Sequence, residues 1–273
     1  MKMKSGIIVL LILLAAVCLC RAEEPETFTS GDYDYYLLDD GTAAIWDYSG
    51  SETELVIPGI LDGRHVTFIG ENAFLLHAEL VSVILPDGVT GIGSSAFSGC
   101  ESLTSVTIPD GVAEIGDWAF NGCKALVSVT FPDSVTGIGE WAFCDCKALT
   151  SVTIPDSVTH IGCNAFSDCE SLSSVTLPDS ITGIADWLFG GCSSLSSVTI
   201  PESVTDIGNS AFIFCSALES VTIPDSVTDI GEDAFFGCDN LTLTVSKGSY
   251  AEEYCAEYGL KYLYPDSPDQ PED

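Results

Sequence analysis

Leu103–Ala125 has the sequence LTSVTIPDGVAEIGDWAFNGCKA, and this stretch recurs with small changes from about residue 58 to residue 241. A proline, a phenylalanine and a cysteine in it each recur every 23 residues. Fixed periods of roughly 20–50 residues are typical of solenoids, in which units too small to bury their own apolar side stack on their neighbours. The repeat therefore predicts one elongated solenoid. The prolines that mark its period are Pro86, Pro109, Pro132, Pro155, Pro178, Pro201 and Pro224.

The apolar positions within one unit predict the path of the chain. Residues 105–108 alternate between outward and inward side chains and are rich in β-branched residues, which favours a short strand. A Pro-Asp-Gly turn at 109–111 ends it, and residues 112–115 predict a second short extended run. Residues 117–124 have the spacing of a helical turn, with the alanine, phenylalanine and cysteine of A-F-x-x-C facing inward. We therefore expect an α/β solenoid of mostly short strands with one helical turn per repeat.

The repeat resembles that of the BspA-like leucine-rich repeat family. The shared motif is L-x-S-V-T-I-P-D-S-V-T-x-I-G-x-x-A-F-x-x-C, which is nearly intact at Leu149–Cys169 and Leu218–Cys238. The resemblance covers about residues 28–264. It implies a leucine-rich-repeat solenoid of bacterial or protist origin at a cell surface, with a role in binding matrix proteins or other cells.

The segment before the repeats has two parts. Residues 1–22 combine two lysines, an apolar run from Ile7 to Leu19 and small residues before a cleavage point at Ala22, which predicts a secretory signal peptide. An uncleaved membrane anchor is the alternative, although the run is short for a membrane span. Residues 28–57 contain extended runs on either side of an Asp39-Asp40-Gly41 turn, which predicts a β-hairpin that caps the N-terminal end of the solenoid.

The repeats themselves are assigned to residues 58–241, as eight units. Residues 242–264 lose the Pro-Asp turn and contain a helical pattern that stops at Gly259, which predicts a short helical C-terminal cap. Residues 265–273 are acidic and rich in proline, which predicts a disordered tail. We expect a monomer that has no membrane attachment after signal cleavage.

The formal net charge of −33 makes nucleic acids and anionic lipids poor partners. Two interpretations of this charge stay open: a solubility device, or an acidic face for a basic partner or for cations. The aspartate after each repeat proline is the obvious cation candidate. Calcium takes 6–8 oxygen ligands, however, and one carboxylate per unit favours a turn-forming role for this residue. We therefore predict no metal site.

Seven cysteines share one inward column, Cys100, Cys123, Cys146, Cys169, Cys192, Cys215 and Cys238. One geometry cannot pair seven equivalent sulfurs, so we expect free buried thiols, which behave as small apolar groups. Secretion permits disulfides, and Cys144 and Cys163 are the alternative pair, at about 7 Å and therefore at the edge of disulfide reach.

The sequence contains no signal for catalysis. It lacks a glycine-rich phosphate loop, a G-x-S-x-G elbow and an H-E-x-x-H helix, and its three histidines have no evident nucleophile partner. We therefore predict a protein that is not an enzyme and has no catalytic residue, cofactor or metal.

The remaining candidates for a functional site are surface residues. The outward serines and threonines of the first strand either suit a solvated strand or form a shallow polar binding face, a use that solenoids make of their strand sheet. Three tryptophans in one slot of the repeat either contact sugar or protein, or cover the phenylalanine column from outside. The candidate partner-binding residues are Ser105, Thr107, Ser128, Thr130, Ser151, Thr153, Ser174, Thr176, Ser197, Thr199, Ser220, Thr222, Trp118, Trp141 and Trp187.

These features predict a secreted, extracellular or cell-surface protein that binds a protein or glycan of a host or neighbouring cell without catalysing a reaction. The adhesion role is what the family resemblance implies, whereas periodicity indicates only a scaffold with a large surface. The alternative is a secreted structural or inhibitory module that acts on one soluble partner, such as an enzyme.

Overall fold

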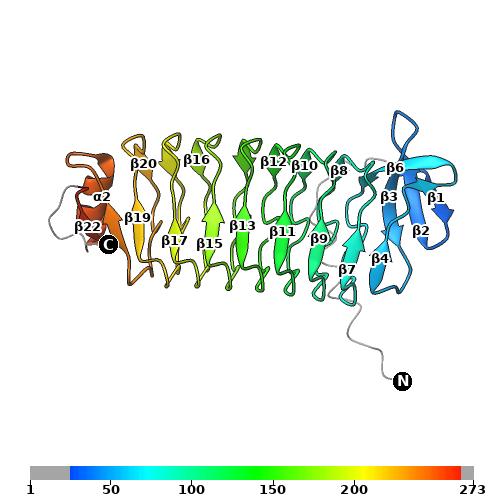
Figure 1. Cartoon of the computed structure of the whole chain (residues 1–273), viewed down its shortest axis with the longest axis horizontal. Helices are drawn as coiled ribbons and strands as arrows, with labels where there is room; N and C mark the ends of the chain where they lie inside the picture. The colour runs from blue at the N-terminus through cyan, green and yellow to red at the C-terminus, as the bar shows by residue number, and fades with distance from the viewer. Residues whose placement is uncertain (1–24, 266–273) are drawn as a thin grey trace, which may run out of the picture.

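The structure is a computed structural model that describes residues 25–265, and in it the repeats stack side by side into an elongated solenoid (Figure 1). The predicted signal peptide lies outside the described residues, as does the predicted tail apart from Pro265. Each 23-residue repeat forms one coil with three sides: two carry a short strand, and the third is a series of turns. The solenoid and the strand positions predicted from the repeat are confirmed.

The first side of the coils forms a ten-stranded sheet, which we call the hydroxyl sheet because its outward residues are mainly serine and threonine. From β4 to β22 its neighbouring strands pair in parallel, and equivalent residues of successive repeats lie opposite each other. Its strands are β4 (Glu54–Val56), β7 (Ser82–Ile84), β9 (Ser105–Thr107), β11 (Ser128–Thr130), β13 (Ser151–Thr153), β15 (Ser174–Thr176), β17 (Ser197–Val198), β19 (Ser220–Thr222), β21 (Thr242–Thr244) and β22 (Lys261–Leu263).

The second side forms two separate sheets. A nine-stranded sheet contains β1 (Thr27–Ser30), β2 (Tyr33–Leu37), β3 (Ala43–Tyr48), β5 (Ile60–Leu61), β6 (Arg64–Ile69), β8 (Gly91–Ile92), β10 (Glu114–Ile115), β12 (Gly137–Ile138) and β14 (His160–Ile161). A three-stranded sheet contains β16 (Gly183–Ile184), β18 (Asp206–Ile207) and β20 (Asp229–Ile230). No pairing joins β14 to β16 within the described residues, and we call this break the seam.

Larger side chains explain the seam. The coil that carries β16 has Ala185 where its neighbours have Gly162 and Gly208, and Leu188 where the other repeats have alanine. The glycine position meets the backbone of the preceding coil: at Gly139, an added Cβ would lie 2.5 Å from the Asp117 nitrogen. Since no real Cβ comes so close, an alanine there must push the two coils apart.

The backbone of the seam coil shows this separation. In the coil before it, Thr159 and Gly162 donate backbone hydrogen bonds of 2.9 and 2.8 Å to the preceding coil. The equivalent N–H groups of Thr182 and Ala185 make no such bond among the described residues. Two strand-side hydrogen bonds between coils are therefore lost at this one place.

The third side departs from the prediction of a helical turn. The described residues contain one helix, α2 (Tyr250–Tyr258), and every repeat has consecutive hydrogen-bonded turns in place of a helix. Trp118 has φ +61° and Gly122 φ +69°, whereas a right-handed helix requires negative φ throughout. Alternate N–H groups, those of Trp118, Phe120 and Gly122, donate to carbonyls of the next coil at 2.8 Å. This turn ladder holds the third side in register as the strands hold the other two.

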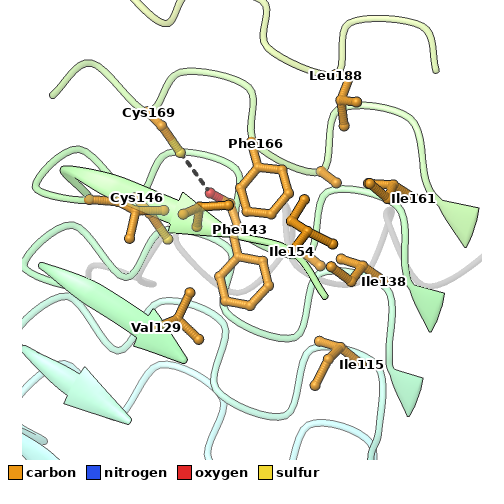
Figure 2. Close-up of a cluster of buried hydrophobic side chains, with 14 of the residues drawn as sticks. Ile115, Val129, Ile138, Phe143, Cys146, Ile154, Ile161, Phe166, Cys169 and Leu188 are labelled. Atoms are coloured by element: carbon orange, nitrogen blue, oxygen red, sulfur yellow. Dashed lines mark hydrogen bonds between the residues drawn. The ribbon is translucent and has the colours of Figure 1, made fainter. Parts of the chain in front are cut away.

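The core is a set of columns, as the repeat predicts. The column phenylalanines are at most 1% exposed, and successive rings stack with centroids 5.0–6.0 Å apart. The widest step, 6.0 Å, is that between Phe166 and Phe189, across the seam. Each column cysteine donates its Sγ–H to the carbonyl of a phenylalanine, as Cys169 does to Phe143 at 3.3 Å (Figure 2). All seven thiols repeat this bond at 3.1–3.3 Å, so each one satisfies a backbone acceptor inside the core.

Different structures cover the two ends of the phenylalanine column. At the N-terminal end, β1, β2 and β3 pair antiparallel, and Tyr48 of β3 lies 5.5 Å from the ring of Phe74. At the C-terminal end, Tyr254 of α2 meets Phe235 edge-on at 6.4 Å. The helix is held by Ser249, which caps its first turn, and by Gly259, which ends it at φ +68°.

Candidate binding surface

The S-V-T strands present hydroxyl groups because strand side chains alternate between the two faces. In the strands from β9 to β19 the central valine is buried, while the flanking serine and threonine point to solvent. All twelve predicted serine and threonine positions are exposed. Parallel in-register pairing, such as Ser128 opposite Ser105 and Thr130 opposite Thr107, arranges them in two columns. Thr199 lies just past the end of β17 but keeps its place in the threonine column.

Part of this face is hollowed into an open groove of about 840 Å³. Its floor contains Ser128, Thr130, Ser151, Thr153 and Thr176. A second hollow, of about 300 Å³, contains Ser197, Thr199, Ser220 and Thr222. The structure thus brings nine of the twelve predicted residues into two hollows of one sheet. Ser105, Thr107 and Ser174 line neither hollow.

The larger groove also contains residues that sequence reasoning did not select. Phe131, Ile154 and Pro155 give it an apolar part, and Asp133 and Asp156 place carboxylates beside it. The Oγ atom of Ser157, another lining residue, is buried without a hydrogen-bond partner. The sequence does contain a signal for these residues, namely the Pro-Asp turn that follows each strand. The turn that ends a strand must lie at the edge of the strand face, so its residues can line a groove there.

One aspartate that follows a repeat proline bonds to the next coil. Asp156 accepts a hydrogen bond from the Asp179 N–H of the next coil at 3.3 Å. Within residues 25–265, no group of three or more histidine, cysteine, aspartate or glutamate side chains is placed to hold a metal ion. Asp133 and Asp156 line the larger groove, so their carboxylates contribute charge to its edge.

The threonine column of the hydroxyl sheet is replaced by aliphatic residues near the N-terminal end of the sheet. Val56 and Ile84 stand where later strands have threonine, and these side chains are 65% and 57% exposed. Because they pair directly with each other and Ile84 pairs with Thr107, the face is continuous but apolar at this end. A ligand that lies along the whole sheet meets hydroxyls over most of its length and aliphatic groups at one end.

The three predicted tryptophans occupy one position of the turn ladder, which we call the αL slot because every residue in it has φ between +54° and +61°. The slot residues are Asn72, Ser95, Trp118, Trp141, Asn164, Trp187, Ser210 and Asp233. Trp118 and Trp141 stack with centroids 4.8 Å apart and planes 6° apart. Trp118 and Trp187 are each 40% exposed, so these side chains present aromatic surface to solvent.

The ten cysteines of the described residues are all free thiols. Burial raises the pKa of Cys100 and of Cys144 to about 12, and that of Cys255 to about 11. Cys144 is buried and Cys163 is half-buried, and they are not joined in a disulfide. Thiols with such raised pKa values are poor nucleophiles at neutral pH, which fits a structural role.

No helix within residues 25–265 has the length and apolar character needed to cross a membrane.

The model of the BspA-type leucine-rich repeat region matches residues 67–153 and 138–252, with six copies. The chain belongs to the BspA-type leucine-rich repeat family. No curated protein sequence matches this member of the family.

Two of the following three solved structures share the architecture of this BspA-type chain. A leucine-rich repeat protein from Bacteroides ovatus is 29% identical, with 87% of this chain and 67% of that chain covered and a TM-score of 0.69. The T. pallidum leucine-rich repeat protein is 32% identical, with coverages of 87% and 98% and a TM-score of 0.64. A leucine-rich cell surface protein from Faecalibacterium prausnitzii is 27% identical, with coverages of 85% and 97% and a TM-score of 0.38.

Proposed function

We propose that this chain is a secreted or cell-surface protein that binds a protein or glycan ligand through its hydroxyl sheet and catalyses no reaction. The observation that carries the proposal is the 840 Å³ groove, in which exposed serine and threonine hydroxyls, apolar side chains and carboxylates converge. Ligand sites combine apolar surface with a few polar groups that fix orientation, and this groove offers both.

The rigid scaffold supports the same proposal. Hydrogen bonds between coils hold each side in register, so the hydroxyl columns are fixed before any ligand arrives. Preorganised surfaces lose little conformational freedom on binding. The family resemblance adds adhesion as the biological setting, and the ligand is then a protein or glycan of a host or neighbouring cell.

Introducing positive charge into the groove tests the proposal. Purified protein is assayed for saturable binding to a panel of matrix proteins and intact cells, at low and high salt. Thr130→Lys and Thr153→Lys place long cations on the groove floor. Thr136→Lys is the matched control, because Thr136 is an exposed threonine of the same coil as Thr130 but lines neither hollow.

We expect the two groove variants to lose binding and the control variant to keep it, at both salt concentrations. Binding that disappears at high salt in the unchanged protein reflects only the acidic surface, since exposed charges are screened beyond about 10 Å at 0.1 M salt. Equal binding by all three variants would contradict the assignment of the groove.

A further inference from the structure

The αL slot contains an interrupted ladder of tryptophans. Trp118 and Trp141 stack on consecutive coils, Asn164 occupies the next coil, and Trp187 follows on the coil after that. The missing ring leaves one coil step with a small polar residue between two indoles. We call this position the open step.

Backbone hydrogen bonds fix the spacing of the open step. The Trp141 N–H donates to the Cys163 carbonyl of the next coil at 2.9 Å, and the Asn164 N–H donates to the Asp186 carbonyl of the coil after it at 3.0 Å. In the core, the same two steps separate the rings of Phe143, Phe166 and Phe189 by 5.4 and 6.0 Å. At the spacing of the core, a flat group in the open step would stand one coil step, about 5–6 Å, from each coil that carries a tryptophan, within the roughly 4.5–7 Å that stacked rings adopt.

The residues around the slot indicate that its tryptophans are not required by the backbone. Left-handed φ costs an L-residue roughly 1–2 kcal/mol, and asparagine and aspartate tolerate it best. Three slot positions have a residue type that tolerates left-handed φ well, namely Asn72, Asn164 and Asp233. Trp118 and Trp187 adopt the same φ although they tolerate it poorly, and each is 40% exposed. Leu76 and Phe214, in another slot, are also exposed at left-handed φ, so the strain alone selects no site; at the αL slot it is combined with the regular spacing of the tryptophans.

The negative charge of the surrounding surface favours a flat group that is positively charged. Glu140 and Asp186 directly precede the two tryptophans that flank the open step. The Glu140 side chain is exposed, whereas the Asp186 carboxylate accepts hydrogen bonds from Asn209 of the following coil and contributes only its charge. Lys124 and Lys147, the cations of the neighbouring coils, are each already paired with carboxylates. With a net charge of −33 on the chain, a cation is favoured over a neutral ring. Among natural cations, the guanidinium group is planar and stacks on aromatic faces.

We propose that the open step, between Trp141 and Trp187, binds the guanidinium group of an arginine side chain presented by a basic protein. The guanidinium lies between the two indoles, and its positive charge is matched by the acidic surface around it. This site is on the turn ladder, away from the hydroxyl sheet, so it does not depend on the groove proposed above.

The test uses the full chain and a short probe peptide, acetyl-Gly-Arg-Gly-amide, titrated at low salt. Binding is followed by NMR through the side-chain signals of the peptide arginine, a readout that does not depend on how many tryptophans a variant contains. Asn164→Trp fills the open step, and Asn164→Ser leaves it open, as the serines at slot positions 95 and 210 do. Trp187→Asn removes one wall, and Trp118→Asn removes a tryptophan outside the step.

We expect about tenfold weaker peptide binding in Asn164→Trp and Trp187→Asn, and unchanged binding in Asn164→Ser and Trp118→Asn. Each replacement is a residue type that the slot already holds in another coil, and circular dichroism confirms folding before titration. Acetyl-Gly-Lys-Gly-amide is expected to bind more weakly than the arginine peptide, because an ammonium group is not planar.

Three results would overturn the proposal. They are undiminished binding of the arginine peptide to Asn164→Trp, equal binding of the lysine and arginine peptides, and absence of binding to the unchanged protein. Methyl β-glucoside is titrated in parallel. If the sugar binds and Asn164→Trp abolishes this while the arginine peptide does not bind, the open step belongs to a glycan site instead.

Discussion

Replacing Gly139 with alanine should open a second seam in the solenoid. The glycine ends the second strand of its coil, where an added Cβ would lie 2.5 Å from the Asp117 nitrogen and 2.7 Å from the Gly116 carbonyl carbon. These neighbours are backbone atoms of the preceding coil, so they cannot rotate away. The coils must separate, as they do at Ala185, which occupies the equivalent position in the chain.

The cost follows from the bonds that separation breaks. Gly139 and Thr136 donate backbone hydrogen bonds of 2.8 Å each to Ile115 and Ala113. Each bond contributes about 0.5–1.5 kcal/mol, and overpacking a close contact costs about 1–3 kcal/mol. Alanine recovers about 0.4–1 kcal/mol by restricting the unfolded chain. We therefore expect Gly139→Ala to lower the free energy of unfolding by about 1–5.5 kcal/mol.

Urea unfolding followed by circular dichroism measures this change, and hydrogen exchange locates it. Gly59→Ala is the control, because the nearest atom to its added Cβ is Cβ of Pro86 at 3.5 Å, an ordinary contact. In the unchanged protein, the amides of Thr182 and Ala185 should exchange faster than those of Thr159 and Gly162. In Gly139→Ala, the amides at 136 and 139 should become equally fast.

The reverse substitution, Ala185→Gly, should slow exchange at residues 182 and 185, although Leu188 continues to hold the coils apart. The reasoning is refuted if Gly139→Ala is as stable as the unchanged protein with both amides still protected. It is also refuted if Thr182 and Thr159 exchange at the same rate in the unchanged protein.

Three further predictions concern the core, the thiols and one carboxylate. Phe143→Leu keeps most of the apolar volume but loses two stacked partners and the edge contact with Phe131, so we expect a loss of about 1–3 kcal/mol in urea unfolding; unchanged stability would mean that stacking contributes nothing. Maleimide should label the half-buried Cys163 before the buried thiols in the native protein, and Cys163→Ala should lose this early labelling. Labelling of the buried thiols at the same rate as Cys163 would contradict their packing. Partial desolvation of the exposed Asp168 carboxylate, together with the nearby Asp145, raises the pKa of Asp168 in the folded state, so stability falls as pH rises through that pKa. Asp168→Asn should therefore raise Tm at pH 7 and have no effect at pH 3, and a lower Tm at pH 7 would refute this.

The 23-residue period predicts most of the fold because each repeat solves the same packing problem. Once Phe120 and Cys123 are placed in columns, their equivalents in the other repeats follow, and the S-V-T alternation decides which side chains face solvent. The position of the hydroxyl columns was therefore accessible from sequence. The groove was not, because its walls depend on how the Pro-Asp turns of neighbouring coils lie against each other.

The helical turn was predicted wrongly for a physical reason. The spacing of Ala119, Phe120 and Cys123 fits a helix, but it also fits consecutive turns whose alternate N–H groups bond to the next coil. The left-handed φ of Trp118 decides between them, and tryptophan is a residue that gives no hint of such a conformation. Asn72, Asn164 and Asp233 at the same slot were the available signal.

The seam interrupts only one of the two strand sides of the solenoid, because the hydrogen bonds lost there belong to the second side. Across the same two coils, β13 and β15 of the hydroxyl sheet remain fully paired, and Thr176 of β15 lies in the 840 Å³ groove together with residues of β11 and β13. The groove therefore lies on a sheet that stays closed across the seam. Ala185 and Leu188, which line no part of that groove, separate neighbouring coils on the second side only, so the hydroxyl columns continue across the seam without a break.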